Sequence, residues 1–178
     1  LGFLPKILGK EIRKIVMNKS YRNTVEIASY ANHLAGITDM ELFERHGEPV
    51  EEKVFSGNPG EALENGLEEI LKKLWLGENQ FETAAVIMRT EEEARKAAGI
   101  LKAKLEATGF DTENHFSYLH RDSTSFCKGI TVTTFYLAKG LEFDQVFSLF
   151  PKADQSPIAR QGRYIAATRA LHRLHMYE

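Results

Sequence analysis

Short apolar runs alternate along this chain with segments in which apolar residues recur every three or four positions. The runs predict strands at residues 14–17, 81–88, 116–119, 130–135 and 146–150, with a last one around Leu174 and Met176. Residues 50–55 are predicted as a short strand or a loop. The helical spacing predicts helices at residues 24–34, 61–75, 90–107 and 163–171.

Local signals support several of these boundaries. Asn23 is expected to cap the first helix, and Thr90 with Glu93 forms a capping box for the third. Gly109 is expected to end that helix, and residues 151–162 are expected to form a polar loop.

Alternating strands and helices predict an α/β fold with a parallel sheet covered by helices on both faces. In such folds, ligands bind beyond the carboxyl ends of strands. Residues 134–144, "TFYLAKGLEFD", place a charged, glycine-containing connection between two predicted strands. We therefore expect a ligand-contacting loop at a carboxyl end.

Composition limits the kind of protein. With 178 residues, 43% of them hydrophobic and 27% charged, one globular domain is expected, and no apolar run is long enough to span a bilayer. The net charge of −2 confines any nucleic-acid site to a local patch. The lone Cys127 fits a reducing compartment, and we expect a cytoplasmic location. The start, without Met, suggests a piece of a longer chain, and the six histidines have no spacing that predicts a metal site.

Three segments carry candidate chemistry. Tyr21 and Arg22 follow a predicted strand, and such a pair can stack on a base and reach a phosphate. The second segment is residues 139–144, where Gly140 permits close backbone approach and Glu142 can accept hydrogen bonds from a ribose. Taken singly, each is more simply a surface Arg beside a packed Tyr, or a solvated turn.

The third segment is residues 163–170, "RYIAATRA". Ala166 and Ala167 would let a helix pack closely on the sheet, so Arg169 would project from a fixed position toward a transferring phosphoryl group. The simpler alternative is a solvent-facing Arg on an amphipathic helix.

Together, and in this order, these segments resemble the second motor domain of superfamily 1A DNA helicases, the UvrD/Rep/PcrA group. "MNKSYRNTVEIASYAN" resembles motif IV, "ITVTTFYLAKGLEFDQVFSLF" motif V, and "GRYIAATRALHRLHMY" motif VI. "TAAVIMRTEEEARKAAGIL" resembles the strand and helix between them. The resemblance extends from Lys14 to the end and implies one RecA-like domain, of P-loop-NTPase type, over residues 1–178.

The resemblance implies a role for each matching residue in ATP binding. Tyr21 would stack on the adenine, and Arg22 would reach the γ-phosphate. Glu142 would contact the ribose, and Gly140 would give the backbone room. Arg169 would be the arginine finger, so Arg22 and Arg169 would be the catalytic residues.

The same resemblance assigns Thr134, Tyr136 and Lys139 to the single-stranded DNA track. Tyr136 stands where the family usually has His, which leaves stacking but removes a hydrogen bond. Ser20, and too few residues between motifs IV and V for a large 2B insertion, favour the helicase IV (HelD-like) branch. Whether Arg160 or Arg163 takes the structural role at the start of motif VI stays open.

No Walker A sequence, Gly-x-x-x-x-Gly-Lys-Ser/Thr, occurs in the chain. We therefore expect ATP and Mg²⁺ to be held in a cleft shared with an N-terminal RecA-like domain of the same chain, and the fragment alone to be inactive. The implied function is an ATP-dependent DNA helicase or translocase, of a kind found in DNA repair, acting on single-stranded DNA or 3′-tailed duplex. Two alternatives remain: an ATPase that remodels RNA polymerase, as HelD-like proteins do, and a doubly wound α/β domain with no nucleotide role.

Overall fold

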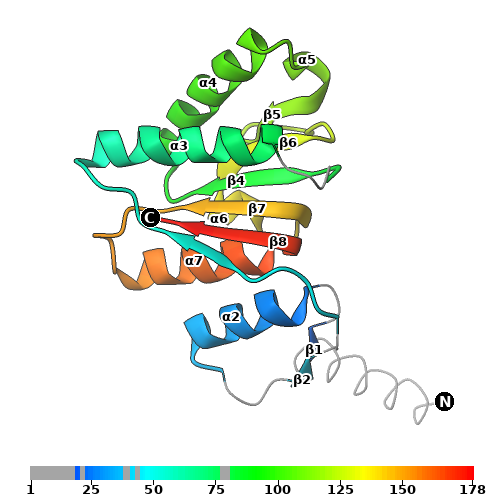
Figure 1. Ribbon diagram of the computed structural model, residues 1–178, viewed down its shortest axis with the longest axis vertical. Helices are drawn as coiled ribbons and strands as arrows, with labels where there is room; N and C mark the ends of the chain where they lie inside the picture. The colour runs from blue at the N-terminus through cyan, green and yellow to red at the C-terminus, as the bar shows by residue number, and fades with distance from the viewer. Residues whose placement is uncertain (1–18, 21–22, 38–40, 43–44, 77–80) are drawn as a thin grey trace, which may run out of the picture.

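The strands of the computed structural model form one parallel sheet. The structure describes residues 19–20, 23–37, 41–42, 45–76 and 81–178. Within them, six strands pair in the order β3-β8-β7-β4-β6-β5, all parallel (Figure 1). Their bounds are β3 (Glu51–Lys53), β4 (Ala84–Met88), β5 (Phe116–Tyr118), β6 (Ile130–Thr134), β7 (Phe143–Leu149) and β8 (Ala170–Tyr177). A separate parallel pair joins β1 (Lys19–Ser20) to β2 (Glu41–Leu42).

Helices cover both faces of this sheet, as the sequence predicts. On one face lie α2, α6 and α7, and on the other lie α3 and α4 (Figure 1). The bounds are α2 (Val25–Ala35), α3 (Pro59–Leu76), α4 (Glu91–Ala107), α5 (Thr112–His115), α6 (Phe135–Ala138) and α7 (Pro157–Thr168). The expected α/β fold class is confirmed.

The central strand β4 shows why the two faces have separate cores. All five of its residues are buried, and successive side chains point to opposite faces. Ala85 and Ile87 pack with α2, α6 and α7, whereas Val86 and Met88 pack with α3 and α4. A strand buried on both sides needs a continuous apolar run, which is how the sequence marks it.

The sequence located both α4 and α2, but it identified the capping residue correctly only for α4. Thr90 caps α4 by accepting a hydrogen bond from the Glu93 N–H at 3.2 Å, as predicted. At α2 the cap is Thr24, which accepts from the Ile27 N–H, and not Asn23. The Asn23 side chain instead contacts the far end of the chain.

The boundaries around motif V also differ from prediction. The strand predicted at residues 130–135 ends at Thr134, which caps the short helix α6 formed by residues 135–138. β7 begins at Phe143 instead of residue 146, because Phe143 already pairs with Ala170 of β8. The connection between α6 and β7 is therefore only residues 139–142.

The largest correction concerns α7. It begins at Pro157, within the predicted polar loop, because Ser156 accepts a hydrogen bond from the Ala159 N–H and Pro157 suits the first helical turn. It ends at Thr168, and Arg169 is its C-cap rather than an interior residue. The final strand β8 starts immediately afterwards. The predicted strand at residues 14–17 lies outside the described residues.

Candidate functional site

Three segments meet where β7 and β8 begin. We call this end of the sheet, where the strands start, the amino edge, and the opposite end, where they finish, the carboxyl edge. The Phe143 N–H donates to the Arg169 carbonyl oxygen at 2.9 Å, which joins the motif V segment to the motif VI segment. Asn23, which directly follows Tyr21 and Arg22 in the sequence, also contacts this edge. Tyr21 and Arg22 themselves lie outside the described residues, so their predicted ATP contacts stay predictions.

The amino edge corrects the expected position of the ligand loop. Thr134 ends β6 level with Leu149 at the carboxyl end of β7, since both pair with Met88. Residues 135–142 then return to the opposite end of the sheet, where β7 starts. Gly140 and Glu142 therefore lead to the amino edge and not to a carboxyl end, because the chain crosses back within eight residues.

Arg169 is held firmly at this edge. As the C-cap of α7, its N–H donates to the Ala166 carbonyl oxygen at 3.1 Å. Its guanidinium Nη1 donates to the Leu141 carbonyl oxygen at 3.3 Å, and Nη2 donates to Thr168 Oγ1 at 3.2 Å. The Arg169 side chain is thus held by neutral oxygens, one on the motif V segment and one on the adjacent Thr168.

The charge of Arg169 is not neutralised within the described residues. None of the carboxylates described lies within ion-pair distance of its half-buried guanidinium. Burial lowers the pKa of Arg169, although the group stays protonated at neutral pH. A partly desolvated cation without a counter-ion is unfavourable, and a bound anion would offset that cost.

Residues of motif V occupy two different environments. Thr134 is buried, and its hydroxyl accepts from the Leu137 N–H at 3.5 Å as the cap of α6. Gly140 has φ of 80°, a left-handed conformation that favours glycine. Glu142 is half-buried beside the start of β7.

Tyr136 and Lys139 form an exposed pair. Tyr136 is 57% exposed although it is a large aromatic residue, and Lys139 Nζ lies 5.3 Å from the centre of its ring. An accessible ring with a neighbouring cation can stack on a base and attract a phosphate. Both side chains are therefore accessible for the predicted contacts with single-stranded DNA.

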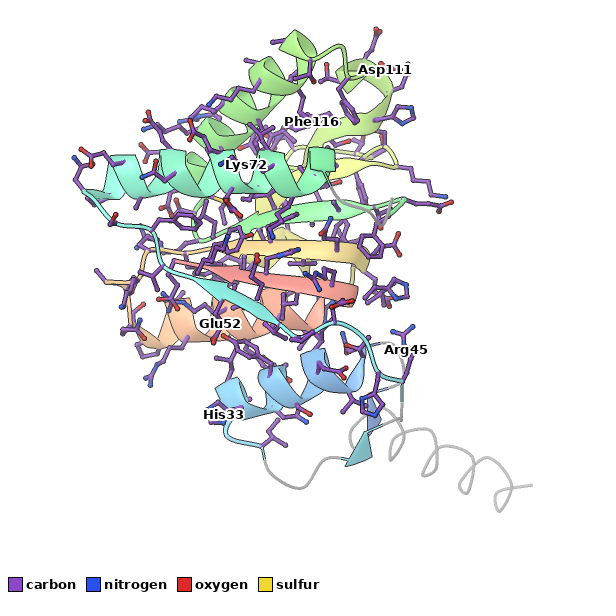
Figure 2. All side chains as sticks on the ribbon, viewed as in Figure 1. His33, Arg45, Glu52, Lys72, Asp111 and Phe116 are labelled. Carbon is purple, nitrogen blue, oxygen red and sulfur yellow. The ribbon has the colours of Figure 1, made fainter. Side chains whose placement is uncertain are left out.

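The sequence interpretation missed two open pockets. One, of about 450 Å³, lies between the loop at residues 119–126 and the motif V residues Leu137 and Leu141. The other, of about 600 Å³, lies at the amino edge and includes Thr24, Asp144 and His172. Arg45 also lines it, beside the amino end of β8, where its guanidinium donates to the Leu171 carbonyl oxygen at 2.7 Å (Figure 2). The polar run "HRDSTS" is the one sequence feature that could have indicated the first pocket. No sequence pattern indicates the second.

The open question about motif VI is answered by burial. Arg163 is 5% exposed, and its guanidinium donates to the carbonyl oxygens of Asp154 and Pro151 at 2.8 Å each. It also lies 5.5 Å from the centre of the Phe150 ring. Arg160 is exposed. Arg163 therefore takes the structural role and holds the loop that precedes α7.

The described part of the chain contains neither a metal-binding cluster nor a membrane-spanning helix. No group of three or more His, Cys, Asp or Glu side chains there is placed to hold a metal ion. Likewise, none of the helices in those ranges is both long and apolar enough to cross a membrane.

Comparison with known proteins supports the helicase resemblance. Residues 129–177, which contain β6, α6, β7, α7 and β8, match the UvrD-like helicase C-terminal domain family. The crystal structure of the C-terminal domain of a possible DNA helicase from Lactobacillus plantarum WCFS1 has the same fold. It aligns with a TM-score of 0.60 and 22% identity over 89% of this chain and 86% of that chain. No curated protein matches the sequence. The HelD-like branch stays a prediction.

Proposed function

We propose that this chain is the C-terminal motor domain of an ATP-dependent DNA helicase or translocase. The observation that carries the proposal is Arg169, a cation that is half-buried, rigidly held and without a carboxylate partner among the described residues. The family match includes this residue. Such a guanidinium suits the charge that develops on a phosphoryl group during transfer.

The amino edge would form one wall of the ATP cleft. Arg169 would contact the γ-phosphate, Glu142 the ribose and Tyr21 the adenine, with Arg22 as a second phosphate contact and Gly140 leaving space for the nucleotide. Because the chain has no Walker A sequence, an N-terminal RecA-like domain would hold the other phosphates and the Mg²⁺. The 178 residues alone would then hydrolyse no ATP.

The motif V segment would connect this cleft to DNA. Tyr136 and Lys139 are exposed near the carboxyl end of β6, and Thr134 fixes the helix that carries Tyr136. Only residues 139–142 separate that helix from the start of β7, where Arg169 contacts Leu141. A shift at the nucleotide would therefore move the DNA contacts, which is the coupling that a translocase needs.

The test is ATP hydrolysis by the full-length protein that contains this chain, with and without single-stranded DNA. We expect DNA to stimulate hydrolysis, Arg169→Ala to lower its kcat about 10³-fold or more, and Tyr136→Ala with Lys139→Ala to remove only the stimulation. Hydrolysis that requires Arg169 but ignores DNA would overturn the DNA assignment and direct attention to RNA polymerase. Hydrolysis that survives Arg169→Ala would overturn the motor assignment.

A further inference from the structure

Asn23 forms hydrogen bonds with the backbone on both sides of Arg169. Its side-chain Nδ2 donates to the Thr168 carbonyl oxygen at 3.2 Å and to the Ala170 carbonyl oxygen at 2.5 Å. The two acceptors are 145 and 147 residues away in the sequence, and only Arg169 lies between them. One amide group therefore uses both of its N–H donors on the peptide that carries the proposed arginine finger.

One of these hydrogen bonds lies where regular structure leaves a carbonyl group without a partner, and the other lies at the first residue of the next strand. Thr168 ends α7, and the last carbonyl groups of a helix have no partner within the helix. Ala170 begins β8, so the chain changes from helix to strand within this single turn. The Asn23 amide supplies partners at the junction, while Thr24 caps α2.

The Asn23 hydrogen bonds are also linked to the guanidinium of Arg169, through Thr168. Two of the guanidinium hydrogen bonds go to Thr168 Oγ1, at 3.2 and 3.4 Å, and the carbonyl group of that same Thr168 is held by Asn23. The remaining backbone contacts of Arg169, to Ala166 and Phe143, fix its peptide groups but not the flanking carbonyl groups. Removing the amide would free the turn to rotate and displace the guanidinium.

We propose that Asn23 is a positioning residue for Arg169, acting on ATP hydrolysis through the geometry of residues 168–170. The inference rests on the proposed function, since it needs Arg169 to contact the transferring phosphoryl group. A misplacement of about 1 Å in a group that contacts the reacting atoms can cost on the order of a hundredfold in rate.

The experiment is a double-mutant cycle in the full-length protein, measured as kcat and KM for ATP hydrolysis. Asn23→Ala and Asn23→Asp each remove the two donors, the second at unchanged size, so that one variant remains if the other does not fold. Asn32→Ala and Asn32→Asp are matched controls on α2, the helix that follows Asn23, where no hydrogen bond joins the Asn32 side chain to another described residue. Thermal unfolding of every variant reports on folding.

We expect Asn23→Ala to lower kcat about ten- to a hundredfold with KM changed less than about threefold. In an Arg169→Ala background, the same change should lower kcat no further, because both residues act at one point. The Asn32 controls should match the unmodified protein. An equal loss from Asn23→Ala in both backgrounds, or no loss in either, would overturn the inference while leaving the role of Arg169 intact. If Arg169→Ala alone leaves kcat unchanged, the proposed function itself fails.

Discussion

Arg89 and Arg169 occupy opposite edges of the same sheet and have opposite electrostatic surroundings. Arg89 follows β4 at the carboxyl edge, where its guanidinium contacts Glu93 at 3.0 Å and Asp154 at 2.8 Å. These hydrogen bonds raise the pKa of Arg89. Hydrogen bonds from Ser156 and from Arg89 hold the pKa of Asp154 at about 2. Arg169 has only neutral oxygen partners in the described residues, and burial lowers its pKa.

The difference separates a charge used for structure from a charge available to a ligand. At the carboxyl edge, Arg89 and Arg163 together hold the loop before α7, since Arg89 donates to Asp154 and both Nη atoms of Arg163 donate to backbone carbonyl oxygens of that loop. At the amino edge, Arg169 is positioned as firmly but keeps a charge that nothing described neutralises. Rigid placement without a counter-ion is characteristic of sites that bind anions.

Exchanging each arginine for alanine tests this difference most directly. Arg169→Ala should reduce kcat for ATP hydrolysis in the full-length protein by about 10³-fold or more, the usual loss for an arginine finger. Arg89→Ala should leave kcat within about threefold and lower the free energy of unfolding by at most about 1 kcal/mol, because its ion pairs are partly exposed. Steady-state kinetics and thermal unfolding measure both. Comparable losses of kcat in the two variants would remove the distinction between the edges.

Lowering the pH is expected to reduce the stability of the fold while leaving the charge of Arg169 unchanged. His175 is buried against Phe147, with Nδ1 2.8 Å from Glu51 and Nε2 2.9 Å from Gln145. Burial lowers the pKa of His175 to about 4, against the raising effect of Glu51. Between pH 6.5 and about 4 the unfolded state therefore binds more protons than the folded state, and stability falls as the pH falls. The expected loss is about 3 kcal/mol, while Arg169 keeps its charge.

Glu51 extends the acid sensitivity to lower pH. Burial favours its protonated form, but hydrogen bonds from Tyr177, His175 and Lys73 outweigh burial and hold the pKa of that carboxyl at about 2. Its contribution is fully present above pH 4.5 and is lost as the pH falls toward 2. Urea unfolding across this range measures both steps. His175→Gln should flatten the curve between pH 6.5 and 4, whereas the exposed His172→Gln on the same strand should not; the reverse pattern would refute the assignment.

Packing of α7 links the two edges, since this helix runs from its N-cap Ser156 at the carboxyl edge to its C-cap Arg169 at the amino edge. Gly162 lies buried against the core, where an added Cβ would come within 2.7 Å of Phe150 and 2.9 Å of Phe135. Gly162→Ala should cost about 1–3 kcal/mol and lower kcat as well, because the helix must move. Gly99→Ala on the exposed face of α4 meets no atom within 4 Å and should stabilise the chain by about 0.5–1 kcal/mol. Thermal unfolding that ranks the two variants equally would contradict this packing.

Sequence predicted those parts of the fold whose cause is local. The apolar run of β4 and the Thr90 cap of α4 each depend on a few adjacent residues, so both were found. α6 was missed because four apolar residues are too few to show a helical period. The start of α7 was missed because Gly162 and Arg163 interrupt its apolar stripe, although Ser156 and Pro157 carried the capping signal.

The candidate site was predictable as residues but not as an arrangement. Arg169, Glu142 and Gly140 stood out through their resemblance to helicase motifs. Their meeting at the amino edge depends on the return of residues 135–142 across the sheet, which follows from strand register. The contacts of Arg169 with Leu141, and of Asn23 with Ala170, end on backbone carbonyl oxygens. Any residue type offers such an oxygen, so no sequence pattern reveals those contacts.

The smallest expected effect concerns Ser156, the N-cap of α7 at the carboxyl edge. Ser156 Oγ accepts from the Ala159 N–H at 3.2 Å, so Ser156→Ala removes the cap and should cost about 1 kcal/mol. Ser156→Thr keeps the hydroxyl and should cost less. Because this end of α7 belongs to the structural edge, kcat should stay unchanged in both variants, as judged by steady-state ATP hydrolysis beside thermal unfolding. A loss of kcat at unchanged melting temperature would place the carboxyl edge in the reaction and break the contrast between Arg89 and Arg169.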